Sequence, residues 1–154
     1  HLIEEIINFS AKNNCRLVLP IDVVTADKIS DKADVKECDI DNIEEQNMIL
    51  DVGKNTVELI KQEISKSKTV FWNGPLGVFE TSPFDKGTVE IANFISNLTE
   101  NNKIRSFAGG GDTISALDLA GVKDNFSYVS TGGGALLELI EGKKLPGLVA
   151  LGIL

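Results

Sequence analysis

The sequence predicts an α/β fold, in which a mostly parallel sheet lies between two layers of helices. Two stretches carry this prediction, because each joins an apolar strand pattern to a helical pattern through three consecutive glycines. The first triplet is Gly109, Gly110 and Gly111, and the second is Gly132, Gly133 and Gly134. Such turns leave amide N–H groups uncovered, so an anion can approach them closely. One such turn, with Asp112 capping the following helix, would be an ordinary connection, but two in succession favour a phosphate-binding edge.

Apolar spacing and turn residues predict the elements of the first half. Residues 1–13 have the apolar spacing of a helix, and residues 15–20 (CRLVLP) predict a short buried strand that Pro20 ends. From Asp27 to Glu45, eight acidic residues face three lysines. We interpret this segment as a solvated excursion rather than a cation site. Gly53 and Asn55 then open a helix that carries Val57, Ile60 and Ile64.

The second half alternates regularly between strand and helix. Residues 69–74 (TVFWNG) predict a strand, and the Pro and Gly residues of the next segment, PLGVFE, forbid regular structure. The run from Asp85 to Asn101 predicts a helix with an apolar face. The two strand–glycine–helix units follow, and LPGLVALGIL closes the chain. Strand–helix loops of a parallel sheet lie at its carboxyl edge, so the loops at 73–80, 109–113 and 131–134 should meet at one edge.

Composition limits the classes of function. The length of 154 residues suits a single domain, and 42% apolar with 25% charged residues is ordinary globular composition. The net charge of −8 argues against nucleic acid and anionic membranes as partners. No apolar run is long enough to span a bilayer. His1 is the only histidine, and the two cysteines lie far apart, so neither a His-based catalytic triad nor a Cys/His metal site is expected.

Common nucleotide-binding fingerprints are absent. GxxxxGK[ST] does not occur, and Ile114 and Leu137 stand where the third glycine of GxGxxG would be. A nicotinamide-dependent dehydrogenase is therefore disfavoured. Bare amides, helix N-termini and one carboxylate remain, and this set suits a nucleoside di- or triphosphate that carries magnesium.

Four segments together resemble a known family. LPIDVVTAD, VFWNGPLGVFE, FAGGGDT and VSTGGGALLELIEGKKLPG are similar, in order and spacing, to the nucleotide-binding domain of phosphoglycerate kinases, and the resemblance covers about Arg16 to Leu151. It implies a Rossmann-like three-layer αβα fold. Residues 1–154 would be a single, incomplete C-terminal nucleotide-binding domain, the later part of that domain. The implied reaction is reversible phosphoryl transfer between ATP and 3-phosphoglycerate in glycolysis.

The resemblance implies roles for residues on the phosphate side. Asp112 would bind the Mg²⁺ of Mg-ATP or Mg-ADP, and Thr113 would contact the phosphates. Gly110 and Gly111 would supply amides beside them, and Asn73 would lie near the terminal phosphates. The transferred phosphoryl group would meet the second glycine turn, so the implied catalytic residues are Gly110, Gly132 and Gly133.

The nucleoside side follows from the same resemblance. Leu50 would form a wall of the adenine pocket, and Gly74, Pro75 and Val78 would line the ribose and base. Glu80 would accept hydrogen bonds from the ribose hydroxyls, a role that suits a carboxylate.

The remaining expectations concern partners. 3-Phosphoglycerate would be held by an N-terminal domain outside this chain, so we expect this fragment alone to be inactive. The intact parent is expected to be a cytoplasmic monomer that binds neither nucleic acid nor membrane. The alternative is a non-catalytic nucleotide-binding α/β module.

Overall fold

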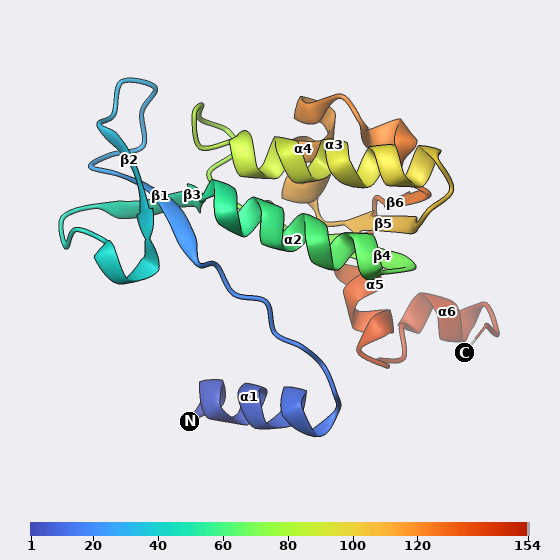
Figure 1. Cartoon of the computed structure of the whole chain (residues 1–154). Coiled ribbons are helices and arrows are strands. Elements are labelled where there is room, and N and C mark those ends of the chain that lie inside the picture. The colour runs from blue at the N-terminus through green and yellow to red at the C-terminus, as the bar shows by residue number, and fades with distance from the viewer. Residues whose placement is uncertain (154) are drawn as a thin grey trace.

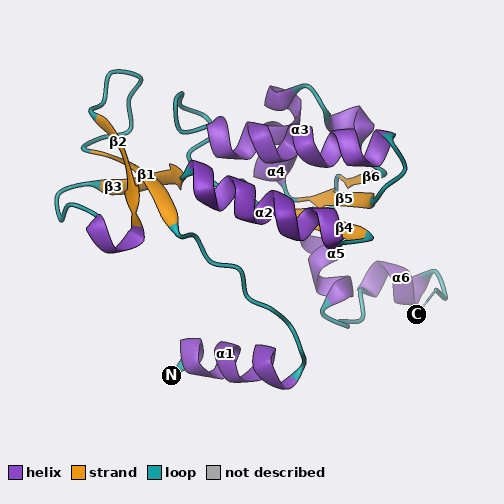
Figure 2. Cartoon of the chain, in the orientation of Figure 1, coloured by secondary structure: helices purple, strands orange, loops and turns teal. Residues whose placement is uncertain are grey.

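The structure is a computed structural model that describes residues 1–153 (Figures 1 and 2). Its helices are α1 (Leu2–Lys12), α2 (Lys54–Lys66), α3 (Lys86–Glu100), α4 (Gly111–Ala120), α5 (Gly133–Ile140) and α6 (Pro146–Ala150), with short 3-10 turns at Ile40–Asn42 and Lys123–Asn125. Its strands are β1 (Asp22–Ala26), β2 (Val35–Asp39), β3 (Met48–Val52), β4 (Thr69–Asn73), β5 (Arg105–Gly109) and β6 (Tyr128–Ser130). No helix among residues 1–153 is long and apolar enough to cross a bilayer.

A parallel sheet in the order β4-β5-β6 forms the centre of the second half. Helices α2, α3 and α4 pack beside one another over one face, and α5 lies against β5 on the other (Figure 1). This three-layer arrangement confirms the predicted fold class. The main core lies between the sheet and the α2–α4 layer, where Trp72, Ile91, Ile95, Leu117 and Phe126 are buried.

A second, antiparallel sheet in the order β2-β1-β3 was not expected from the sequence. β2 lies within the acidic excursion, where it pairs with β1 from Val35 opposite Ala26 to Asp39 opposite Asp22. A short connection suffices for antiparallel strands, so no helix separates β1 from β2. Charged residues occupy most of β2 and its residues are largely exposed, which hid the strand pattern.

The predicted buried strand at residues 15–20 is wrong. This segment forms no strand, and Leu17 and Leu19 are 43% and 69% exposed. It runs as an extended connection from α1 to β1, and no described strand lies beside it to accept its backbone hydrogen bonds (Figure 1). The predicted N-terminal helix is confirmed as α1, but its apolar face is open, with Leu2 and Phe9 69% and 70% exposed.

Candidate functional site

Three irregular connections meet at the carboxyl edge of the parallel sheet. Asn73, at the end of β4, is paired in register with Gly109 of β5, which is paired in turn with Ser130 of β6. The segments that follow these residues therefore leave the sheet side by side. This confirms the predicted convergence of the three glycine-rich loops.

The turn between β5 and α4 lies against the loop after β4. Gly110 has a φ of 99°, a conformation that L side chains rarely adopt, and its carbonyl accepts the first helical bond from Ile114 at 3.0 Å. A Cβ added at Gly110 would lie 3.2 Å from Oδ1 of Asn73. Thr113 is 1% exposed, and its hydroxyl accepts a 2.7 Å hydrogen bond from the amide of Gly74. The structure thus brings together Asn73, Gly110 and Thr113, three residues predicted for the phosphate side, with Gly74, which was predicted for the nucleoside side.

Asp112 lies exposed in the first turn of α4, beside the open backbone of Gly111. It does not cap the helix, because Gly110 occupies the N-cap position and no side chain bonds there. Among residues 1–153, no group of three or more His, Cys, Asp or Glu side chains could hold a metal ion. A single carboxylate still fits magnesium that arrives with a nucleotide, because Mg²⁺ takes one or two carboxylates together with phosphate oxygens and water.

The turn between β6 and α5 packs onto the first glycine turn. Gly133 is buried, and a Cβ added there would lie 2.3 Å from the nitrogen of Gly110. Gly132 and Gly134 face open space and are exposed. The accessible backbone of this turn therefore belongs to Gly132 and Gly134, while Gly133 contacts the neighbouring turn.

An apolar hollow of about 270 Å³ lies between β3 and the loop after β4. The amide of Val78 donates a 2.8 Å hydrogen bond to the carbonyl of Leu50, and this bond holds the two residues side by side in the lining. The lining consists of Pro20, Val23, Ile49, Leu50, Asp51, Val52, Leu76, Gly77 and Val78.

Three residues of the same loop that were predicted for the nucleoside side do not line this hollow. Gly74, Pro75 and Glu80 are not among its lining residues, and Glu80 is exposed. Conversely, Leu76 and Asp51 line it without having been predicted. Leu76 could have been found from its place within the same loop motif, whereas nothing in the local sequence marks Asp51 as part of a pocket.

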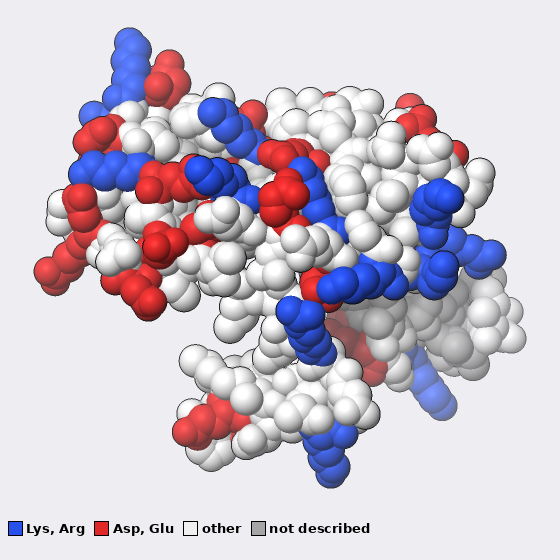
Figure 3. Space-filling view, in the orientation of Figure 1, with Lys and Arg blue, Asp and Glu red and all other residues white. Residues whose placement is uncertain are grey.

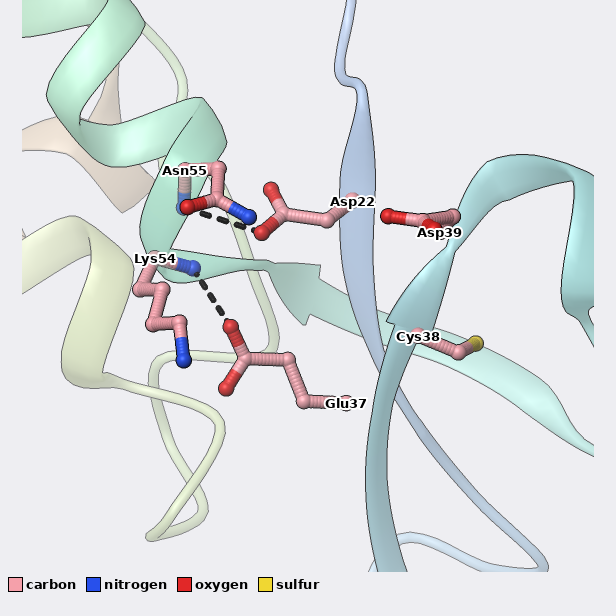
Figure 4. Close-up of a pocket in the computed structure, with 6 residues that line it drawn as sticks. All are labelled: Asp22, Glu37, Cys38, Asp39, Lys54 and Asn55. Carbon is pink, nitrogen blue, oxygen red and sulfur yellow. Dashed lines mark hydrogen bonds between the residues drawn. The ribbon is translucent and has the colours of Figure 1, made fainter.

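A second hollow, of about 250 Å³, lies at the N-terminus of α2 and is lined by the chain's own carboxylates (Figure 4). Asp22 accepts hydrogen bonds from the amides of Asn55 and Thr56 at 2.9 and 2.7 Å, and Glu37 accepts one from the amide of Lys54 at 2.9 Å. Burial raises the pKa of Asp22, but hydrogen bonds from Thr56 and Asn55 outweigh it and hold the pKa below its usual value. Asp22 and Glu37 take the place that an anion would occupy at the N-terminus of α2. They cap the helix, so we do not interpret this hollow as an anion site.

Basic side chains gather at the opposite edge of the parallel sheet. Lys68, Lys103 and Arg105 line a hollow of about 550 Å³ where β4 and β5 begin. Figure 3 shows Lys and Arg side chains clustered over this end of the sheet. This cluster is separated from the glycine turns by the length of the strands, so it cannot neutralise a phosphate bound there.

The fold and this edge define an α/β protein whose strand-to-helix loops converge beside an apolar hollow. The family model described as phosphoglycerate kinase matches residues 1–143. The phosphoglycerate kinase of Chelativorans sp. (strain BNC1) is 50% identical over 142 residues, which are 92% of this chain and 36% of the relative. That of Xanthobacter flavus is 47% identical over 137 residues, which are 89% of this chain and 34% of the relative.

Solved structures that resemble this chain belong to the same family as these sequence relatives. The phosphoglycerate kinase structure from Coxiella burnetii has a TM-score of 0.89 and 39% identity, covering 97% of this chain and 37% of its own. That from Pyrococcus horikoshii OT3 has a TM-score of 0.71 and 29% identity, covering 99% and 38%. The chain belongs to the phosphoglycerate kinase family, and it spans about a third of the length of the curated relatives it matches.

Proposed function

We propose that this chain holds Mg-ATP or Mg-ADP within a phosphoglycerate kinase, which transfers a phosphoryl group reversibly between ATP and 3-phosphoglycerate in glycolysis. The observation that carries the proposal is the meeting of Asn73, Gly110 and Thr113 at the carboxyl edge of the parallel sheet. Ligands of open α/β sheets bind at this edge, where helix N-termini favour negative charge.

On the phosphate side, the backbone of Gly111 and the N-terminus of α4 would receive the phosphates. Asp112, exposed beside them, would bind the magnesium, which neutralises phosphate charge when present. Thr113 would act mainly by holding Gly74 in place, because its buried hydroxyl already accepts a hydrogen bond from the Gly74 amide. Asn73 would donate its Nδ2 amide to the terminal phosphates, since its side chain lies beside Gly110.

On the nucleoside side, the apolar hollow walled by Leu50 and Val78 would take the adenine ring. A pocket of mostly apolar lining suits a flat aromatic base. Gly74 and Pro75 would line the ribose, and Glu80 would accept hydrogen bonds from the ribose hydroxyl groups.

The catalytic contribution of this chain would come from backbone amides. The exposed turn at Gly132, with Gly110 and Gly133 behind it, would face the phosphoryl group during transfer and stabilise its charge. 3-Phosphoglycerate would be bound by an N-terminal domain outside this chain. We further propose that the intact enzyme is a cytoplasmic monomer.

Titration of the purified chain with Mg-ADP tests the proposal. Trp72 is the only tryptophan, and its indole N–H donates to the carbonyl of Gly74, so its fluorescence reports on the loop after β4. We expect saturable binding that weakens when magnesium is removed. Asp112→Asn should abolish the magnesium-dependent part, whereas Asp118→Asn, an exposed acid near the other end of α4, should not.

Two outcomes would contradict the proposal. If Asp112→Asn lowers the affinity for ADP equally with and without magnesium, Asp112 does not bind the metal. A wild-type chain that binds no Mg-ADP at millimolar concentrations would overturn the nucleotide-binding role itself.

A further inference from the structure

Asp51 is a buried carboxylate that links two elements beside the apolar hollow. It lies on β3 and is 2% exposed, and its two oxygens accept 2.8 Å hydrogen bonds from the amides of Val52 and Gly87. Gly87 belongs to the first turn of α3, so the carboxylate joins that turn to β3. Burial and, to a lesser degree, the charge of Asp85 raise the pKa of Asp51 and outweigh the two amide hydrogen bonds that lower it, so that the resulting pKa is about 6. Keeping this group buried is costly, which points to a role that an apolar side chain cannot fill.

The carboxylate also occupies the space left by two glycines. A Cβ added at Gly77 would lie 2.5 Å from Oδ1 of Asp51, and one added at Gly87 would lie 2.6 Å from the same atom. Gly77 is part of the loop after β4. The loop can therefore approach β3 only as far as the Asp51 carboxylate allows.

Further hydrogen bonds fix the loop from its other side. The hydroxyl of Thr88 accepts the amides of Leu76 and Gly77 at 3.0 and 3.3 Å, and the carbonyl of Leu50 accepts the amide of Val78 at 2.8 Å. Thr88 is fully buried and directly follows Gly87, the residue that Asp51 binds. Asp51 thus positions the turn of α3 from which Thr88 holds the loop.

From these contacts we propose that Asp51 is a positioning residue for the nucleoside part of the ligand. It sets the distance between β3 and the Leu76–Val78 wall, and so the width of the apolar hollow, without contacting the phosphates. The inference rests on the proposed nucleotide-binding function and deepens it. It separates the site into a nucleoside half that depends on Asp51 and a phosphate half, at Gly110 to Thr113, that does not.

The test compares a ligand with a nucleoside and one without. Asp51→Asn keeps the size of the side chain but turns an NH2 group toward one of the two amide donors. We expect its affinity for Mg-ADP to fall about tenfold, because a buried donor loses its acceptor. Its affinity for magnesium tripolyphosphate should stay within about twofold of wild type. Titration calorimetry of folded protein, verified by circular dichroism, measures both.

A milder pair of variants guards against a folding defect in Asp51→Asn. Thr88→Val removes the hydroxyl that holds Leu76 and Gly77, and it should reproduce the selective loss of Mg-ADP binding. Thr88→Ser retains the hydroxyl and should bind Mg-ADP as the wild type does. Asp22→Asn is the matched control: this carboxylate is also 2% exposed, but it caps α2, so it should leave the ratio of the two affinities unchanged.

The outcomes separate this inference from the function on which it rests. Equal losses for Mg-ADP and magnesium tripolyphosphate in both Asp51→Asn and Thr88→Val would overturn the positioning role, since a general structural role predicts that result. Unchanged Mg-ADP binding in both variants would also overturn it. A wild-type chain that binds neither ligand would overturn the proposed function and the inference together.

Discussion

The backbone of Gly133 rests directly on that of Gly110, so close that a Cβ on Gly133 would lie 2.3 Å from the Gly110 nitrogen and 2.6 Å from its Cα. The two glycine triplets are therefore not two independent phosphate loops. One residue of the second triplet supports the first, and the exposed glycines on either side of Gly133 remain open to a ligand.

Gly133→Ala should destabilise the fold, because the added methyl group meets backbone atoms that cannot turn aside. We expect a loss of about 1–3 kcal/mol in the free energy of unfolding, the usual cost of overpacking. Gly134→Ala is the matched control, since nothing lies within 4 Å of its added Cβ. Urea unfolding of both variants measures the difference. Equal stabilities would show that the two turns separate easily in solution.

Thr113→Val should weaken the connection between the loop after β4 and α4. The valine keeps the buried shape but offers no acceptor to the Gly74 amide, which Thr113 now accepts at 2.7 Å. Leaving this donor unpaired should cost about 1–3 kcal/mol in unfolding free energy. Thr113→Ser retains the hydroxyl and should recover most of the loss. If valine and serine behave alike in thermal unfolding, the hydrogen bond contributes little.

The sequence was sufficient to predict the fold in the part of the chain where strands and helices follow one another directly. Apolar spacing located α2, α3 and α4, and the glycine triplets located the edge at which Asn73, Gly110 and Thr113 meet. These features depend on residues close together in the chain, for which periodicity and turn chemistry are reliable guides.

Features that depend on distant partners could not be predicted. Residues 15–20 have the composition of a buried strand, yet a strand requires a neighbour to pair with, and none of the described strands accepts them. Asp51 looks like an ordinary acid until folding brings Gly77 and Gly87 against it. Only the structure shows that Gly133 is buried while Gly132 is exposed.

Asp51 should make the stability of the chain fall as pH rises from about 4 to about 6. Its pKa is about 6 in the folded state against 3.8 ordinarily, so in this interval the folded chain binds a proton that the unfolded chain has released. This pKa shift corresponds to a contribution of about 3 kcal/mol to the free energy of unfolding, and the contribution is lost once the pH is above 6. Asp51→Asn should lack this decline, as urea unfolding between pH 4.5 and 7.5 would show.

The neighbouring Asp85 provides a second check on the same titration. Its charge raises the pKa of Asp51, so Asp85→Asn should move the decline in stability to lower pH. Asp22 acts in the opposite sense: its lowered pKa contributes stability that is lost only as pH falls below the usual range of a carboxyl. Parallel stability curves for wild type and Asp51→Asn would mean that Asp51 does not titrate with a raised pKa.

The final prediction is that this chain alone does not transfer a phosphoryl group to 3-phosphoglycerate. Both proposed substrates are anions, while the chain has a net charge of −8. Its cluster of Lys68, Lys103 and Arg105 lies at the amino ends of β4 and β5, opposite the glycine turns. An exposed helix N-terminus contributes only about 0.3–1 kcal/mol toward holding an anion.

Phosphoryl-transfer enzymes stabilise the group in transfer with Lys or Arg side chains in addition to amides and metal. Because the chain spans about a third of its relatives, we expect those cations to come from the part of the enzyme outside it. A coupled kinase assay with the full-length enzyme as the positive control measures this directly, and adding the separately produced remainder should restore turnover if the two parts associate. Robust turnover by the 154-residue chain alone would show that its own amides and magnesium suffice for the chemistry.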